Sequence, residues 1–128
     1  MAKTFTEELR AAAGKQWDRV INHRFTTELA RGDIDRSVLK KYLIQDHRFL
    51  DAFVVLLSSA IAKARNLEDR IPGCQFLGLI TGKENTYFER SFEVLGCSKD
   101  ERTMIPDENV TVNFCNLMRE VSYEGSLG

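Results

Sequence analysis

The sequence lacks an excess of charge of either sign, because its 18 lysine and arginine residues nearly balance its 19 aspartate and glutamate residues. The charges are scattered, so no basic stripe is present to follow a phosphate backbone. The longest apolar run, Phe53 to Ala62, contains two serines and is too short to span a bilayer. The N-terminus has no apolar segment behind its charges. We therefore expect a cytoplasmic protein that binds neither nucleic acid nor membranes.

Cysteine pairs and metal-ligand motifs are also missing. The three cysteines, Cys74, Cys97 and Cys115, are odd in number and form no C-x-x-C motif, which favours reduced thiols over a disulfide framework or a zinc site. The E-x-x-H motif of di-iron bundles is absent. A lone histidine such as His23 more often caps or packs a helix than binds haem. The sequence thus implies no metal and no cofactor.

What the sequence does contain is helical periodicity, which in 128 residues with 43% apolar content predicts a single domain, residues 1–128. A capping box of Thr4 and Glu7 begins the first segment, whose apolar stripe weakens near His23 and which ends at Gly32. A second helix follows a cap at Asp33 or Asp35 and continues to about residue 65. This second helix has the most sustained apolar face in the chain.

Two further helices are predicted in the second half. The third runs from about Pro72 to Gly96, with two glycines in its middle and Glu84 and Glu89 expected in solvent. The fourth runs from about Pro106 to residue 125, although VTVNF within it is ambiguous between strand and helix. The fold class that agrees with all four segments is an all-α helical bundle.

One acid interrupts the apolar stripe of the second helix. At 100° per residue, Asp46 falls within about 40° of Tyr42 and about 20° of Phe53, so it should point inward. An ionised carboxylate in an apolar interior is unfavourable, so Asp46 must be paired, hydrogen-bonded or shifted toward its neutral form. Either it forms a structural ion pair with another helix, or it lies in a pocket beside Phe49. An acid next to an aromatic ring suits a flat, nitrogen-rich heterocycle with an amino group.

The segment around this acid, GDIDRSVLKKYLIQDHRFLDAF, resembles the signature of the TenA family, the thiaminase II or aminopyrimidine aminohydrolase proteins. Matching segments extend outward: His23 and Phe25 near the start, YFERSFEVLGCSKDER in the middle, and IPDENVTVNFCNLMREVSYEGS near the end. The resemblance thus covers nearly the whole chain. It implies the haem-oxygenase-like helical fold that the family shares with pyrroloquinoline-quinone synthesis proteins.

The resemblance also implies a function in thiamine salvage, namely hydrolysis that removes an amino group, or the thiazole, from the aminopyrimidine part of thiamine or its breakdown products. Asp46 matches the aspartate that binds the pyrimidine. Phe49 and Asn113 fall where many members carry a tyrosine, so a stacking surface is kept at Phe49 while hydroxyl groups are lost. These departures leave open a protein that binds the pyrimidine without catalysis, or a purely structural bundle. Asp46, Phe49 and Asn113 are the expected substrate-binding residues.

The family's nucleophilic cysteine, or the glutamate used in its place, has no counterpart in this sequence, so the catalytic residues are unassigned. Cys115 lacks an evident base and is expected to be a core residue. We expect the domain to be incomplete at its C-terminus, about four helices into the bundle. The apolar face with Phe49, Phe53 and Leu57 would then be uncovered, so we also expect a homo-oligomer.

Overall fold

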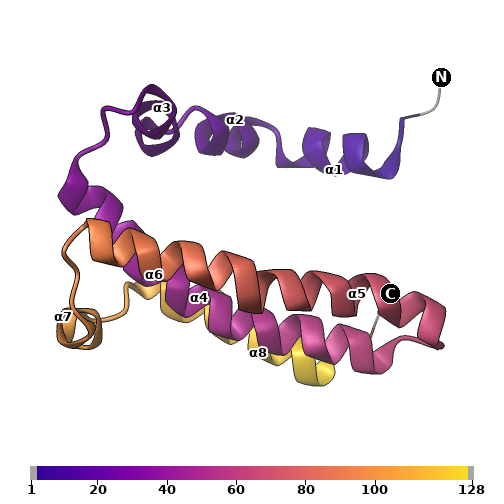
Figure 1. Cartoon of the computed structure of the whole chain (residues 1–128). Coiled ribbons are helices and arrows are strands. Elements are labelled where there is room, and N and C mark those ends of the chain that lie inside the picture. Colours follow the sequence, from indigo (N-terminus) through magenta and orange to yellow (C-terminus); the bar gives the residue numbers. More distant parts are fainter. Residues whose placement is uncertain (1–2, 127–128) are drawn as a thin grey trace. The chain divides into compact units, whose positions relative to one another are not determined.

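The computed structural model describes residues 3–126, and every regular element in that range is helical, as the predicted all-α fold class requires (Figure 1). The chain divides at Asp35 into two compact units. The N-terminal unit contains α1 (Phe5–Ala13), α2 (Lys15–Ile21) and α3 (Arg24–Arg31). The C-terminal unit contains α4 (Arg36–Lys63), α5 (Leu67–Leu79), the π-helical segment η1 (Ile80–Glu84), α6 (Asn85–Val94), α7 (Lys99–Met104) and α8 (Asn109–Glu124). The expected single domain stays a prediction.

The first predicted helix is three helices in the structure. The capping box at Thr4 is present, with the Glu7 backbone and side chain both bonded to it. Gly14 then breaks the helix, because its φ of 51° and ψ of −129° lie in a region that favours glycine. His23 caps α3, its Nδ1 accepting from the Phe25 N–H at 3.1 Å, so this histidine is a capping residue. Gly32 ends α3 in the left-handed conformation, as predicted.

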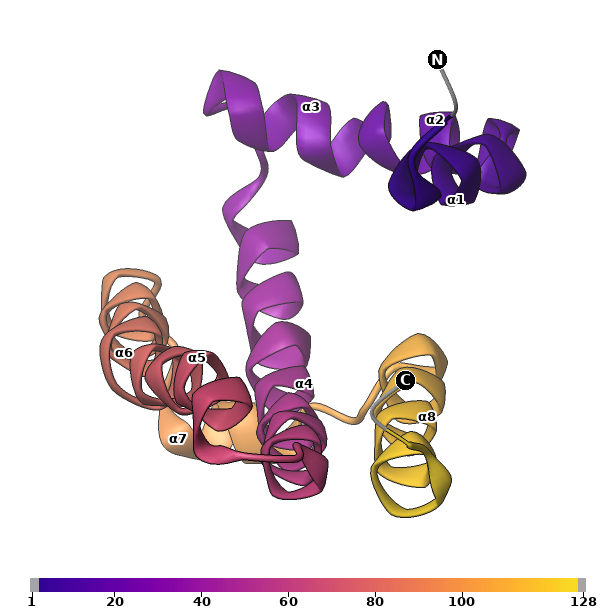
Figure 2. The same ribbon diagram turned by 90° about the vertical axis from the view of Figure 1, so that its right-hand side faces the viewer.

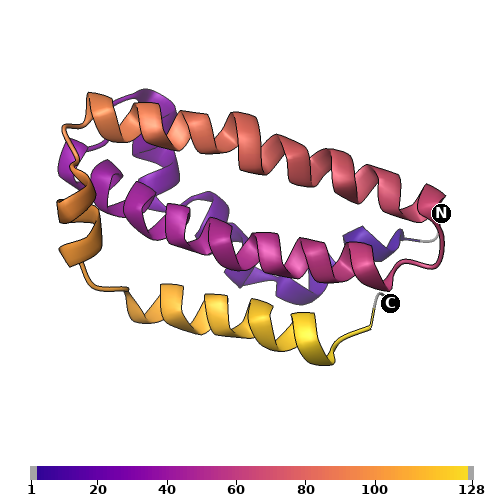
Figure 3. The same ribbon diagram turned by 60° about the horizontal axis from the view of Figure 1, so that its bottom comes forward.

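Within the C-terminal unit, α4 lies in the middle of one layer of helices. The continuous run of α5, η1 and α6 lies along one side of α4, and α8 lies along the other (Figures 2 and 3). The short helix α7 joins the two outer rows at one end of the layer (Figure 3). This arrangement follows from the apolar face of α4. The helix is 28 residues long, and it contacts α5 and α6 on one side and α8 on the other.

The predicted start of the third helix was wrong by five residues. The helix begins at Leu67, because the Asn66 side chain accepts from the Asp69 N–H at 2.9 Å and caps it there. Pro72 therefore lies inside α5 and not in its first turn. In the middle of the predicted helix, the five residues of η1 replace α-helical turns. The short helix α7, capped by Ser98, was not predicted at all.

Two small cores hold the layer together. One joins Ile44 of α4 to Phe88 and Phe92 of α6 and to Cys97. The other joins Ala52 of α4 to the inner face of α8. That inner face has buried residues at helical spacing, namely Thr111, Cys115, Met118 and Ser122. The ambiguous VTVNF segment is therefore helical, because it completes this stripe.

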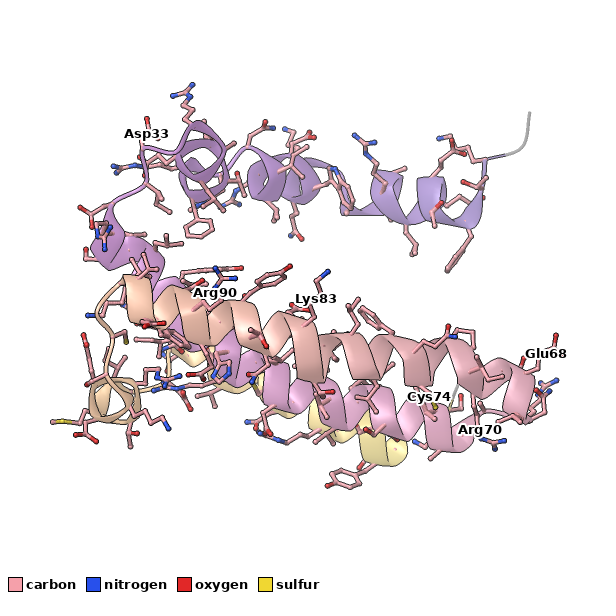
Figure 4. The ribbon with its side chains drawn as sticks, viewed as in Figure 1. Asp33, Glu68, Arg70, Cys74, Lys83 and Arg90 are labelled. Atoms are coloured by element: carbon pink, nitrogen blue, oxygen red, sulfur yellow. The ribbon has the colours of Figure 1, made fainter. Side chains whose placement is uncertain are left out.

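The cysteines are free, as expected: Cys97 and Cys115 are buried, and Cys74 is exposed on α5 (Figure 4). Among the helices described, none is both long and apolar enough to cross a membrane.

The close approach of α5 to α4 depends on Gly73. A Cβ atom placed there would lie 2.7 Å from Cγ1 of Ile61, whose branched side chain has little freedom to move. We expect Gly73→Ala to lower the free energy of unfolding by about 1–3 kcal/mol through overpacking. The measurement is urea unfolding followed by circular dichroism.

Gly78→Ala on the same helix is the matched control. Nothing lies within 4 Å of a Cβ placed at Gly78, so the better helix propensity of alanine should raise stability by about 0.5–1 kcal/mol. Equal effects of the two substitutions would contradict the packing described for Gly73.

Candidate functional site

Asp46 lines a cavity of about 240 Å³ between α4 and the start of α8. The lining comes entirely from the C-terminal unit and combines one acid, one amide, two hydroxyl groups and apolar side chains: Tyr42, Gln45, Asp46, Phe49, Val110, Thr111 and Phe114. Two of the three predicted binding residues, Asp46 and Phe49, thus lie in one cavity. Their spacing on a single helical face explains why sequence periodicity could place them together.

The polar end of the cavity is formed by Asp46 and Tyr42, one helical turn apart. Burial raises the pKa of the Asp46 carboxyl, and the nearby negative charge of Glu84 raises it further. A hydrogen bond from the Tyr42 hydroxyl and the proximity of His47 act in the opposite direction. Within residues 3–126, none of the salt bridges includes Asp46. The acid is therefore half-buried and hydrogen-bonded, and the structural ion pair considered above is not found there.

The aromatic end of the cavity is a stack of rings from three helices. Phe49 stacks on Phe114 of α8 with ring centroids 5.0 Å apart and planes 16° apart. On its other side Phe49 stacks on Phe53 at 5.9 Å, and Phe53 meets Phe76 of α5 edge to face. Phe49 and Phe53 are consequently half-buried, so the expected uncovered face of α4 is partly covered by α5 and α8.

Phe114 is an aromatic site residue that sequence reasoning missed. The signal was present in its spacing, because Val110 and Phe114 are four residues apart and share one face of α8. Asn113, the third predicted residue, is exposed and is not among the residues that line this cavity. One position along a helix turns a side chain by about 100°, which is enough to separate neighbours in this way.

Gln45 fixes the wall that α8 contributes. Its Oε1 accepts from the Thr111 hydroxyl at 2.7 Å and from the Glu108 N–H at 3.1 Å. Its Nε2 donates to the Pro106 carbonyl at 3.0 Å. Both ends of one amide are therefore occupied by the start of α8 and the link before it. This arrangement holds Phe114 against Phe49.

A larger cavity, of about 870 Å³, is lined partly by basic side chains, and the bonds of two of these are structural. Arg48 of α4 pairs with Asp107 and donates to the Arg102 and Ile105 carbonyls. Arg102 forms a two-point salt bridge with Glu89 and lies over the Phe92 ring. Arg48 thus ties α7 and the link after it to α4, and Arg102 ties α7 to α6. The cavity is therefore a weaker ligand-binding candidate than its size suggests.

Cys115 lines the same large cavity, and burial raises the pKa of its thiol. A raised pKa disfavours the reactive thiolate, so Cys115 is a core residue and a poor nucleophile. Among the described residues, no group of three or more histidine, cysteine or acidic side chains is placed to hold a metal ion.

Comparison with known proteins decides the family. A model of the TENA/THI-4/PQQC family matches residues 10–128, which is most of the chain. The chain belongs to the TENA/THI-4/PQQC family. Membership confirms the resemblance and the all-α, haem-oxygenase-like fold class. Among curated proteins, no sequence matches this family member.

In this TENA/THI-4/PQQC family member, the raised pKa of Asp46 should make the free energy of unfolding depend on pH. The pKa of Asp46 is higher in the folded chain than in the unfolded chain. At pH values between these two pKa values, the folded chain binds more protons than the unfolded chain, so the free energy of unfolding falls as pH rises through that interval. Asn in place of Asp46 carries no charge and still accepts from Tyr42. We expect Asp46→Asn to be more stable than wild type near pH 7, with the difference shrinking toward about pH 4.

Urea unfolding of both proteins across this pH range is the measurement. Asp51→Asn, on the same helix and exposed, is the control and should change stability little. A structural acid would behave in the opposite way, because Asp46→Asn would then lower stability at pH 7.

Proposed function

We propose that this chain binds the aminopyrimidine part of thiamine or of its breakdown products, as a thiaminase II-like protein of thiamine salvage in the cytoplasm. The observation that carries the proposal is the placement of a half-buried acid and a stacked aromatic pair, Asp46 with Phe49 and Phe114, in one cavity. Family membership supports the same assignment.

The chemistry of the cavity fits this ligand. An aminopyrimidine has a flat ring, and the half-exposed Phe114 ring, which stacks on Phe49, offers it a flat apolar surface. Its amino group and ring nitrogens need an acceptor and a group that shares a proton, which a carboxyl with a raised pKa supplies. The volume of about 240 Å³ suits a small fragment better than a complete cofactor.

The reaction proposed for such a fragment is hydrolysis at the aminomethyl carbon. Water adds its oxygen to that carbon, the carbon–nitrogen bond breaks, and the amino group leaves as ammonia with the proton that water gives up. Asp46 would hold and orient the ring during this step. The nucleophile or base that activates water is not assigned to any residue of this chain.

A second candidate is a protein that binds the pyrimidine without hydrolysing it. The loss of hydroxyl groups at Phe49 and Asn113 relative to many family members favours it, as does the raised pKa of the Cys115 thiol. The two candidates share one ligand and one cavity. Turnover is therefore what separates them.

Calorimetric titration with an aminomethylpyrimidine tests the shared step. We expect wild type to bind and Asp46→Asn to lose at least about tenfold in affinity, because a hydrogen bond to a charged group contributes about 1.5–3 kcal/mol. Asp51→Asn removes the same charge from an exposed position on α4 and should bind like wild type.

Ammonia release in the same samples then distinguishes an enzyme from a binding protein. If wild type fails to bind, or if Asp46→Asn binds equally well, the proposal is wrong.

We also propose that the chain forms a homo-oligomer through the outer stripe of α8, defined as Val110, Phe114, Leu117 and Val121. These residues recur at helical spacing, adjacent to the buried inner stripe, and each is between 46% and 73% exposed. An apolar stripe of this kind on a helix favours pairing with a second copy across a two-fold axis.

Sedimentation velocity at increasing concentration tests this second proposal. We expect association in wild type and a shift toward monomer in Leu117→Glu, which leaves the residues lining the cavity unchanged. Glu120→Lys, exposed on the same helix, is the control. A wild-type chain that stays monomeric throughout would contradict the proposal.

A further inference from the structure

The candidate cavity opens at the surface of the C-terminal unit. Three of its lining residues, Tyr42, Val110 and Phe114, are 43%, 73% and 49% exposed. Sites for small molecules usually bury about 70–90% of the ligand's surface. A cavity with walls as exposed as these covers one side of a pyrimidine ring, and a further wall is needed to cover the other side.

Two of these exposed residues also belong to the outer stripe of α8. Val110 and Phe114 form its first half, and Leu117 and Val121 continue it away from the cavity. Within the C-terminal unit, α8 forms the outer row of the layer on one side of α4 (Figure 3). The mouth of the cavity and the outer stripe are therefore parts of one apolar surface.

The spacing of the outer stripe suits a second copy of the same chain. Its residues follow one another at steps of four, three and four positions, an order that is the same in both directions. Alternating steps of three and four residues are the pattern of a coiled-coil seam. In a symmetric dimer each contact occurs twice, so this stripe can pair with itself in antiparallel orientation. Val110 then lies opposite Val121 of the partner subunit, and Phe114 lies opposite Leu117 of the partner subunit.

The residue types along α8 fit this pairing as well. All four positions of the outer stripe are apolar, whereas the charged residues of α8, Arg119, Glu120 and Glu124, lie outside it. An antiparallel pair of stripes therefore places apolar side chains against apolar side chains along its whole length.

The area that a dimer needs extends the contact toward the cavity. A stable interface buries about 800 Å² on each partner, which is more than four half-exposed side chains on one helix supply. The apolar surface next to the outer stripe is the aromatic stack in which Phe114 meets Phe49 and Phe49 meets Phe53. A second copy that covers the outer stripe therefore also covers the mouth of the cavity.

We infer that the pyrimidine cavity is completed by a second copy of the chain, with Leu117 and Val121 of the partner subunit forming the missing wall opposite Phe114 and Val110. The inference rests on the proposed function. A two-fold axis gives each copy the same wall, so the dimer has two equivalent sites, and it binds the pyrimidine more tightly than a single chain does. By thermodynamic linkage, the pyrimidine in turn strengthens the dimer.

Leu117→Glu separates the partner's wall from the chain's own cavity. Leu117 is about half exposed and does not line the cavity of its own chain, so the variant keeps every lining residue while an acid in the outer stripe opposes pairing. Calorimetric titration with an aminomethylpyrimidine should show about tenfold weaker binding than in wild type, because the apolar contact with the partner is lost. Glu120→Lys, exposed on the same helix, should bind like wild type.

A second measurement uses wild type alone, so it does not depend on how the variant folds. Sedimentation velocity with and without a saturating aminomethylpyrimidine should show that the ligand shifts the chain toward dimer. The affinity measured by calorimetry should also rise with protein concentration over the range in which the dimer forms.

The outcomes separate this inference from the proposed function. If Leu117→Glu is folded by circular dichroism and monomeric, yet binds as tightly as wild type, one chain holds the whole site, and the inference is overturned while the proposed function stands. The same holds if wild type binds but stays monomeric with the ligand, because another segment or none then covers the mouth of the cavity. If wild type does not bind, the proposed function and the inference both fail. Weaker binding in the variant together with ligand-driven dimerisation supports the shared site.

Discussion

The side-chain amide of Gln45 makes three hydrogen bonds, to the Thr111 hydroxyl, the Glu108 N–H and the Pro106 carbonyl, and these fix the start of α8 against α4. The other features of the candidate site depend on this attachment. With α8 attached at this point, Phe114 stacks on Phe49, and the two rings line one cavity with Asp46. A half-buried amide with both ends satisfied also favours one register of α8 over others.

The two sides of α4 serve different purposes. One side has Arg48 and His47, whose bonds fasten α7, the following link and α6. The other has Asp46 and Phe49, which line the candidate cavity. Structural groups are thus fully engaged, whereas the acid proposed to bind ligand carries a raised pKa, an unfavourable environment that stability alone does not explain.

Much of this organisation could be predicted from the sequence, and the errors have physical causes. Helical spacing predicted α4, α8 and the inward direction of Asp46, because periodicity reports directly on which face is buried. The third helix began too late, since Pro72 was taken as its first turn while the Asn66 cap was overlooked. The division of the first helix at Gly14 was missed because one glycine does not reveal its own backbone angles.

The sequence by itself determined the helical fold class, the family and the acid at the centre of the site, since each depends on residue types at fixed spacing along one chain. Only the tertiary structure decided which residues from other helices join that acid. Phe114 and the hydrogen-bond partners of Gln45 lie between 61 and 68 residues away from Asp46 or Gln45 in sequence. Their meeting depends on the packing of α8 against α4, which no local pattern specifies.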